Sequence, residues 1–141
     1  MADYDPDNVF AKILSGEFPS HKVHEDDHTL VIMDIMPRGD GHALVIPKAP
    51  SRNILDILPK DLAALYATAQ HVARAAMTAF EADGITIQQF NEPAGGQVVF
   101  HTHVHVIPRH QGIPLKPHTG ERADDAALAA QAEKLRAALG G

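Results

Sequence analysis

The sequence contains no cysteine, which excludes disulfide bonds, thiolate nucleophiles and cysteine-ligated zinc. It also lacks an apolar run near ~18 residues, so we expect no membrane-spanning segment. The first residues, MADYD, lack the basic and apolar regions of a signal peptide. These absences favour a cytoplasmic protein.

Positive charge is scarce as well. The 12 Lys and Arg residues are dispersed and outnumbered by 18 Asp and Glu residues, which gives a net charge of −6. Such a chain has no electrostatic footprint for a nucleic acid backbone. Its 141 residues are enough for one domain with a single core, so we expect one domain over residues 1–141. We therefore expect a small molecule as partner, and neither nucleic acid nor membrane.

Three histidines recur at every second position in the C-terminal third of the chain, at His101, His103 and His105. Side chains at i, i+2 and i+4 of a β-strand project from one face, about 6.6 Å apart at ~3.3 Å rise per residue. The β-branched residues Val104 and Val106 favour a strand and would face a helix on the other side. The spacing predicts three imidazoles in a row on an uncovered, wet face.

The rest of the chain alternates between strand and helix patterns. Asp7 is expected to cap a short helix that Gly16 ends, and Gly84 is expected to stop a long amphipathic helix over residues 59–83. Strands are predicted at residues 21–25, 29–34, 42–46, 85–91 and 98–108, a surface segment at 109–122 and a terminal helix at 124–139. The pattern predicts an α+β fold with a five-stranded, mostly antiparallel sheet, one long helix packed on it, and a short N-terminal and a C-terminal helix.

A row of histidines has three possible interpretations: a metal site, a polar sheet face without a function, and a catalytic nucleophile. Imidazole is a common ligand of divalent metals, and a strand can present i, i+2 ligands to zinc. A hydrogen-bonded polar sheet face needs no function at all. A neutral imidazole is also a good nucleophile toward phosphorus at neutral pH and needs no separate base. The turn that precedes the row, Gly95 and Gly96, can aim backbone N–H groups at an anion, with Gln97 as an amide donor, and so favours phosphoryl chemistry.

Four ordered motifs resemble the histidine triad family, which comprises nucleotidyl hydrolases and transferases built on an α+β sheet. Residues 95–109 read GGQVVFHTHVHVIPR, and the earlier matches are VFAKILSGEFP at 9–19, EDD with MDI at 25–27 and 33–35, and GHALVIPK at 41–48. The resemblance covers residues 8–110, which leaves residues 111–141 as a C-terminal segment and helix. It is far more specific than the histidine row alone.

The resemblance implies a role for each matching residue. His103 would attack the α-phosphorus to form a nucleotidyl-histidine intermediate, His101 would orient its ring, and His105 would contact the phosphate or the leaving group. His42 matches a fourth family histidine that supports the cluster, and Asp34 matches the carboxylate that holds the ribose hydroxyls. The base would lie against Phe10, Ile13 and Ile35, and the phosphate path would be lined by Asn91, Gly96, Gln97 and Val98.

The chain also departs from the family pattern. Asn8 and Ala11 stand where some bacterial members carry a pair of zinc-binding cysteines, so we expect no metal and no cofactor. Val98 stands where phosphoramidase-type members place a serine that touches the phosphate, which leaves the preferred leaving group open. His105 is a true third histidine, unlike the glutamine of the uridylyltransferase branch.

The expected function is therefore a nucleotidyl hydrolase that releases a purine nucleoside monophosphate from an amine or phosphate leaving group, as a phosphoramidase does. A dinucleoside polyphosphate hydrolase and a nucleotide-binding or sensing protein with incidental turnover are the alternatives. We also expect a homodimer, because the strand at residues 85–90 carries neither charge nor proline to protect it as a sheet edge. The small residues Ala63, Ala67, Ala75 and Ala79 beside the core stripe of the long helix would let a symmetric partner approach.

Overall fold

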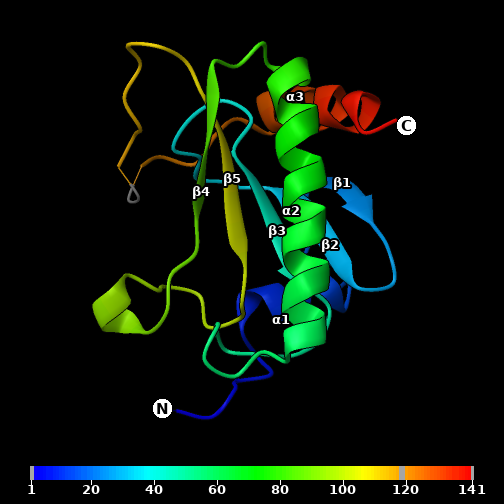
Figure 1. Ribbon diagram of the computed structural model, residues 1–141, viewed down its shortest axis with the longest axis vertical. Coiled ribbons are helices and arrows are strands. Elements are labelled where there is room, and N and C mark those ends of the chain that lie inside the picture. Colours follow the sequence, from blue (N-terminus) through cyan, green and yellow to red (C-terminus); the bar gives the residue numbers. More distant parts are fainter. Residues whose placement is uncertain (1, 118–119, 141) are drawn as a thin grey trace.

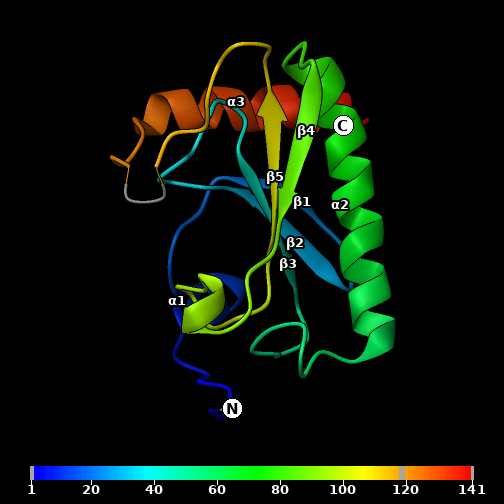
Figure 2. The ribbon, with the colours of Figure 1, turned by 60° about the vertical axis from the view of Figure 1, so that its left-hand side comes forward.

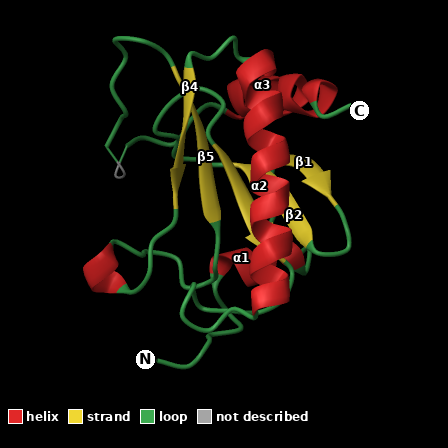
Figure 3. Ribbon diagram, in the orientation of Figure 1, coloured by secondary structure: helices red, strands yellow, loops and turns green. Residues whose placement is uncertain are grey.

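The computed structural model describes residues 2–117 and 120–140. Five strands form one sheet in the order β1-β2-β3-β5-β4, and each neighbouring pair is antiparallel (Figures 1 and 3). The elements are α1 (Val9–Leu14), β1 (Lys22–Glu25), β2 (Thr29–Met33), β3 (Ala43–Pro47), α2 (Pro59–Ala79), β4 (Gly84–Gln88), a 3-10 turn (Pro93–Gly95), β5 (Val104–Arg109) and α3 (Asp125–Ala138). The predicted α+β class and antiparallel sheet are confirmed.

One face of the sheet packs against α2 and α3. The strands contribute alternate residues to this core, among them Val31, Val45 and Val104, and α2 contributes Leu65 and Val72. Leu128 and Leu135 of α3 complete it, as their common side of the helix predicts. Figure 2 shows α2 along one side of the sheet and α3 crossing its end. Val104 and Val106 face this helical layer, which confirms the orientation expected for them.

The opposite face is covered as well, so the expectation of an uncovered, wet face is wrong. Helix α1 places Phe10 on a second apolar cluster formed by Leu30, Ile32, Leu44 and Ile46. Asn8, rather than Asp7, caps α1, because the Asn8 side chain accepts the Ala11 N–H at 2.9 Å. The site histidines share this buried face, since His105 pairs in register with Leu44.

The last strand begins later than predicted. Residues 98–103 lie outside the ladder, and β5 starts at Val104. These residues before Val104 do not pair with β3 or β4, because Thr102 binds Ser51 instead. The Thr102 N–H donates to the Ser51 carbonyl at 2.9 Å, and the hydroxyls of the two residues lie 2.6 Å apart. Only His105 of the three histidines therefore belongs to a strand.

Helix α2 is also shorter than expected. It ends at Ala79. The chain turns at Glu81, which has a positive φ of 48°, three residues before the expected stop at Gly84. Gly84 instead begins β4. Ala63 and Ala67 are exposed on α2, whereas Ala75 is buried and Ala79 packs against the core. The four alanines therefore do not form one exposed stripe.

The segment after β5 returns to the loop between β2 and β3. The Lys116 N–H donates to the Arg38 carbonyl at 2.9 Å, and the Ala123 N–H donates to the Ile35 carbonyl at 2.8 Å. Residues 118–119 of the predicted surface segment lie outside the described residues, and Arg109 belongs to β5. Within the part of the chain that the structure describes, no helix is long and apolar enough to cross a membrane.

Three glycine substitutions separate backbone strain from steric clash next to the site. Gly41 has a φ of +81°, and a Cβ there would lie 2.7 Å from the Phe80 ring. Gly16 has a φ of +85° and Gly84 has no positive φ, with open space around both. We expect Gly16→Ala to lower the free energy of unfolding by about 1–2 kcal/mol and Gly41→Ala by about 1–3 kcal/mol more.

Gly84→Ala is the matched control, because neither strain nor clash opposes it. Its free energy of unfolding should equal the wild-type value or exceed it by up to about 1 kcal/mol. Urea denaturation of the three variants measures this order. Equal losses for Gly41→Ala and Gly16→Ala would show that Phe80 does not close the turn before His42.

Candidate active site

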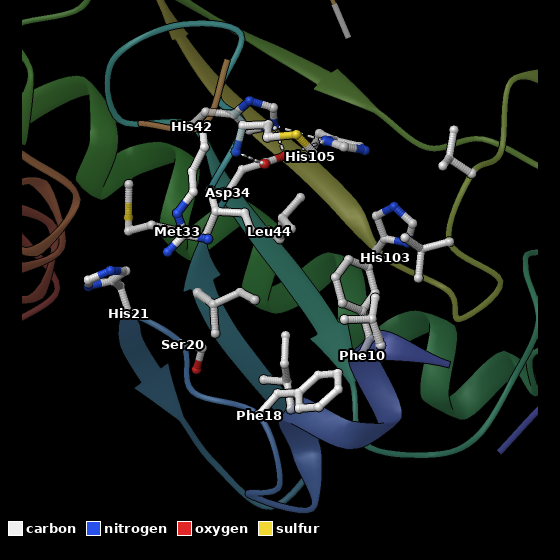
Figure 4. Close-up of a pocket in the computed structure, with 18 of the residues that line it drawn as sticks. Phe10, Phe18, Ser20, His21, Met33, Asp34, His42, Leu44, His103 and His105 are labelled. Atoms are coloured by element: carbon white, nitrogen blue, oxygen red, sulfur yellow. Dashed lines mark hydrogen bonds and ion pairs between the residues drawn. The ribbon is translucent and has the colours of Figure 1, made fainter. Parts of the chain in front are cut away.

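A cavity of about 750 Å³ opens on the sheet face that α1 covers. Its walls are mostly apolar, with Phe10, Phe18 and Leu44 among them. Figure 4 shows Asp34, His42 and His105 grouped together, Phe10 beside His103, and Phe18 and Ser20 across the cavity from that group. A cavity of this size, mostly apolar with a few converging polar groups, has the character of a small-molecule site.

Nine of the twelve residues that the sequence predicts for the site line this cavity. They are Phe10, Ile13, Asp34, Ile35, His42, Gly96, Val98, His103 and His105. The pattern also missed lining residues that come from the segment between α1 and β1, from β2 and the loop after it, from the segment after β4 and from around the start of α3. These include Phe18, Ser20, His21, Ile32, Met36, Phe90, Arg122 and Asp125.

Three predicted residues are not among those that line the cavity. His101 is fully buried, and its Nε2 lies 2.8 Å from the Pro47 carbonyl. The Asn91 side chain accepts the Ile54 N–H at 2.8 Å. The Gln97 amide donates to the carbonyls of Arg52 and Val99, and its oxygen accepts from Asn53 and the Glu92 N–H. Gln97 thus braces the loop and is not aimed at a phosphate.

The glycine turn also differs from the expected anion cradle. The N–H groups of Gly95 and Gln97 donate to the Glu92 carbonyl, and the Gly96 N–H donates to the Pro93 carbonyl. These bonds form because the chain closes a 3-10 turn at Pro93–Gly95. The three amides are therefore already occupied in this conformation.

The loop that carries these residues is held by an ion pair that the sequence did not reveal. Arg52 contacts both carboxylate oxygens of Glu92 at 2.8 and 3.1 Å, and Asn53 donates to the same carboxylate at 2.6 Å. Arg52 also stacks over the Phe100 ring at 4.2 Å. The partners are about 40 residues apart in the chain, so no local spacing could have indicated them.

His103 is the imidazole best placed for nucleophilic attack. Its Nδ1 lies 2.6 Å from the His101 carbonyl oxygen, which can only accept, so the ring hydrogen is on Nδ1 and the Nε2 lone pair is left for chemistry. Burial lowers the pKa of His103 to about 4. The ring is therefore neutral at pH 7.

His42 and His105 form a directed chain of hydrogen bonds. The Arg38 N–H donates to Nδ1 of His42 at 3.0 Å, so neutral His42 carries its hydrogen on Nε2. That nitrogen lies 2.8 Å from Nδ1 of His105, which accepts the bond and leaves the His105 hydrogen on Nε2. The ring of His105 lies next to that of His103, with the two centroids 5.0 Å apart.

Asp34 completes the polar end of the cavity. Its Oδ1 accepts the Met36 N–H at 2.8 Å, and its Oδ2 lies 3.4 Å from Nε2 of His42. Burial raises the pKa of Asp34 to about 6, against the lowering effect of the Met36 hydrogen bond. This carboxyl therefore titrates close to neutrality.

The same three side chains have the composition of a metal site. Ligand atoms of Asp34, His42 and His105 lie within 4.8 Å of one another, at separations of 2.8, 3.4 and 4.0 Å. Tetrahedral zinc with bonds of ~2.0–2.1 Å would hold its ligands about 3.3 Å apart. However, His42 would have to give Nε2 to the ion and move its hydrogen to Nδ1, where it meets the Arg38 N–H. The hydrogen-bond pattern therefore opposes a metal at this position.

The HIT domain family model matches residues 15–112. The chain belongs to the HIT domain family. Members of this family are nucleotide-binding hydrolases and transferases. Over 103 residues the chain is 40% identical to the adenylylsulfatase HINT3 of Arabidopsis thaliana, a match that covers 73% of this chain and 52% of that protein. The chain thus spans about half the length of this curated relative.

Solved structures of HIT proteins share the fold. A HIT-like protein involved in cell-cycle regulation from Bartonella henselae, with an unknown ligand, is 46% identical, with a TM-score of 0.91 and coverage of 96% of this chain and 99% of that chain. A zinc-bound histidine triad family protein from Mycobacterium smegmatis is 38% identical, with a TM-score of 0.83 and coverage of 95% and 94%.

Metal analysis tests the hydrogen-bond pattern around His42. After dialysis against a chelator, we expect the purified protein to contain far less than one equivalent of zinc, because metal binding requires the His42 hydrogen to face the Arg38 N–H. Elemental analysis of the wild type and of Asp34→Asn measures the zinc content of each protein. One retained equivalent in the wild type that is lost in Asp34→Asn would contradict the pattern.

Proposed function

We propose that this HIT protein is a nucleotidyl hydrolase that releases a purine nucleoside monophosphate from an amine or phosphate leaving group. The observation that carries the proposal is the state of His103. Its Nδ1 is bonded to the His101 carbonyl, and burial lowers its pKa, so a neutral ring with a free Nε2 lone pair faces the cavity. Such a ring can attack an α-phosphorus without a base to activate it.

The reaction runs in two displacement steps. Nε2 of His103 forms a bond to the α-phosphorus while the bond to the leaving group breaks, which gives a nucleotidyl-histidine. The His105 Nε2–H can donate to a phosphate oxygen or protonate the leaving group, with His42 behind it in the hydrogen-bond chain. Water then attacks the phosphorus and returns its proton to the His42–His105 pair, and the P–N bond breaks so that His103 departs as the neutral imidazole.

The lining residues support one orientation of the nucleotide in the cavity. Its phosphate lies at His103, its ribose hydroxyls bond the Asp34 carboxylate, and its base lies against Phe10, Ile13 and the other apolar walls. Because Gln97 and the glycine amides are occupied by the loop, phosphate contacts at that side come from the histidines unless the loop rearranges.

On the leaving-group side of the cavity, the side chain at position 98 cannot select one leaving group over another by hydrogen bonding. Val98 lines the cavity and is 81% exposed. Its aliphatic side chain offers no hydrogen bond to the departing group. Adenosine phosphoramidate, a diadenosine polyphosphate and adenylyl sulfate, the last suggested by the name of the Arabidopsis relative, form the panel that ranks the leaving groups. A dinucleoside polyphosphate hydrolase would prefer the second substrate, and a sensing protein would bind nucleotide without useful turnover of any.

Removal of the nucleophile should separate catalysis from binding. We expect His103→Ala to lower kcat on adenosine phosphoramidate by at least about a thousand-fold, while the Kd for adenosine monophosphate changes only a few-fold because the ribose and base contacts remain. His71→Ala, at an exposed position on α2, is the matched control. Retention of more than a few per cent of kcat in His103→Ala would remove His103 from the nucleophile's role.

Ribose recognition should depend on Asp34 and on pH. The carboxylate accepts hydroxyl hydrogen bonds, and Asn would place an N–H₂ group in front of donors. We expect Asp34→Asn to reduce the kcat/KM preference for ribose over 2′-deoxyribose substrates by ten-fold or more, as for ~1.5–3 kcal/mol in hydrogen bonds to a charged group. In the wild type the preference should fade as the pH falls through about 6, because Asp34 then becomes protonated.

The pH control for this prediction is Asp34→Asn itself, whose weak preference should not change with pH. The neutral His103, with its pKa of about 4, keeps attack possible over the same range, so turnover of the 2′-deoxy substrate should persist between pH 5 and 6. An unchanged ribose preference in Asp34→Asn would place the ribose elsewhere.

The working unit in this proposal is a homodimer. Strand β4 is the edge strand beside β5, and its Ile87 is 43% exposed. We expect light scattering to give a dimer mass in the wild type and a mass near the 15.2 kDa monomer for Ile87→Lys, with the fold intact by circular dichroism. A wild-type monomer at all concentrations would contradict the dimer.

A further inference from the structure

Tyr4 lies ahead of α1, and no motif in the sequence points to it. Its phenol oxygen lies 2.7 Å from Nδ1 of His101, 97 residues later in the chain. The two rings meet edge to face, with centroids 5.6 Å apart. Burial raises the pKa of Tyr4, so the hydroxyl keeps its hydrogen at neutral pH.

The Pro47 carbonyl fixes the tautomer of His101, and Tyr4 binds its other ring nitrogen. Nε2 of His101 lies 2.8 Å from the Pro47 carbonyl, which can only accept, so Nε2 carries the ring hydrogen. Nδ1 must then accept, and the Tyr4 hydroxyl donates to it. Both nitrogens of a fully buried imidazole are thereby satisfied by named partners.

The segment that holds His101 and His103 depends on such side-chain bonds. It precedes β5, so no ladder of strand hydrogen bonds fixes residues 101–103. The bonds of Thr102 to Ser51 hold one side, and the ring of His101, between Tyr4 and Pro47, holds the other. The His101 carbonyl in turn accepts the Nδ1–H of His103 at 2.6 Å. The position of that carbonyl decides where the His103 lone pair points.

We propose that Tyr4 is a positioning residue, whose hydroxyl holds the His101 ring and, through the His101 carbonyl, the orientation of the nucleophile His103. The inference rests on the proposed function for its catalytic consequence, and on the hydrogen bonds alone for its structural one. Tyr4 belongs to the site even though it neither lines the cavity nor touches a nucleotide there.

Tyr4→Phe tests the inference, because it removes only the hydroxyl. We expect kcat on adenosine phosphoramidate to fall about five- to ten-fold, with KM and the Kd for adenosine monophosphate unchanged. Nitrogen-15 spectra should show His101 as the Nε2–H tautomer in both proteins, with the Nδ1 resonance shifted in Tyr4→Phe toward that of an unbonded nitrogen because the hydroxyl donor is lost. Tyr66→Phe, which alters the chain's other tyrosine, on α2, is the control and should match the wild type in both measurements.

A double-mutant cycle separates positioning through His101 from a general effect of the N-terminal segment. If Tyr4 acts through His101, Tyr4→Phe should cost little further kcat in a His101→Asn background. Additive losses would overturn the inference, as would wild-type kcat together with an unchanged His101 spectrum in Tyr4→Phe. If the wild type turned over no nucleotide, the proposed function would fail alone, and the nitrogen-15 spectra would still decide whether the Tyr4 hydroxyl holds the His101 ring through Nδ1.

Discussion

The hydrogen bond from Nδ1 of His103 to the His101 carbonyl is the interaction on which the rest of the site depends. It fixes the tautomer, and so decides that Nε2 carries the lone pair that faces the cavity. The other histidines follow the same rule, since the main chain binds one ring nitrogen of each inner histidine, through the Arg38 N–H at His42 and the Pro47 carbonyl at His101. Main-chain groups thus fix the tautomers of His42, His101 and His103, and the His42 side chain fixes that of His105.

Burial on the α1 face has two opposite electrostatic consequences, and both suit nucleotide chemistry. It lowers the pKa of His103 and keeps the nucleophile neutral, and it raises the pKa of Asp34 until that carboxyl titrates near pH 6. In the proposed reaction a neutral His103 can attack phosphorus without prior deprotonation, whereas the proposed ribose contact requires an ionised Asp34 carboxylate. Loss of water around each group is the main cause of both pKa shifts.

The sequence predicted what short-range periodicity encodes. Alternation placed Val104 and Val106 on the helical face and the 3.6-residue period found α2 and α3, since both patterns arise from neighbours in the chain. The pattern failed at Thr102, which hydrogen-bonds to Ser51 and so does not pair in the sheet. It also failed at Gly95 and Gly96, whose amides are bonded within the 3-10 turn. Tyr4, Arg52 and Glu92 act through partners about 40 or more residues away, which no local spacing could show. Nine of the twelve expected site residues nevertheless line the cavity, because the family resemblance supplied the long-range pairing that periodicity lacks.

Trapping of the covalent intermediate tests the central claim most directly. Wild-type protein mixed with adenosine phosphoramidate and quenched in alkali within one turnover should carry an adenylyl group, and fragmentation by mass spectrometry should place it on His103. Turnover without such an adduct, or an adduct on His42 or His105, would contradict the assignment of His103 as the nucleophile.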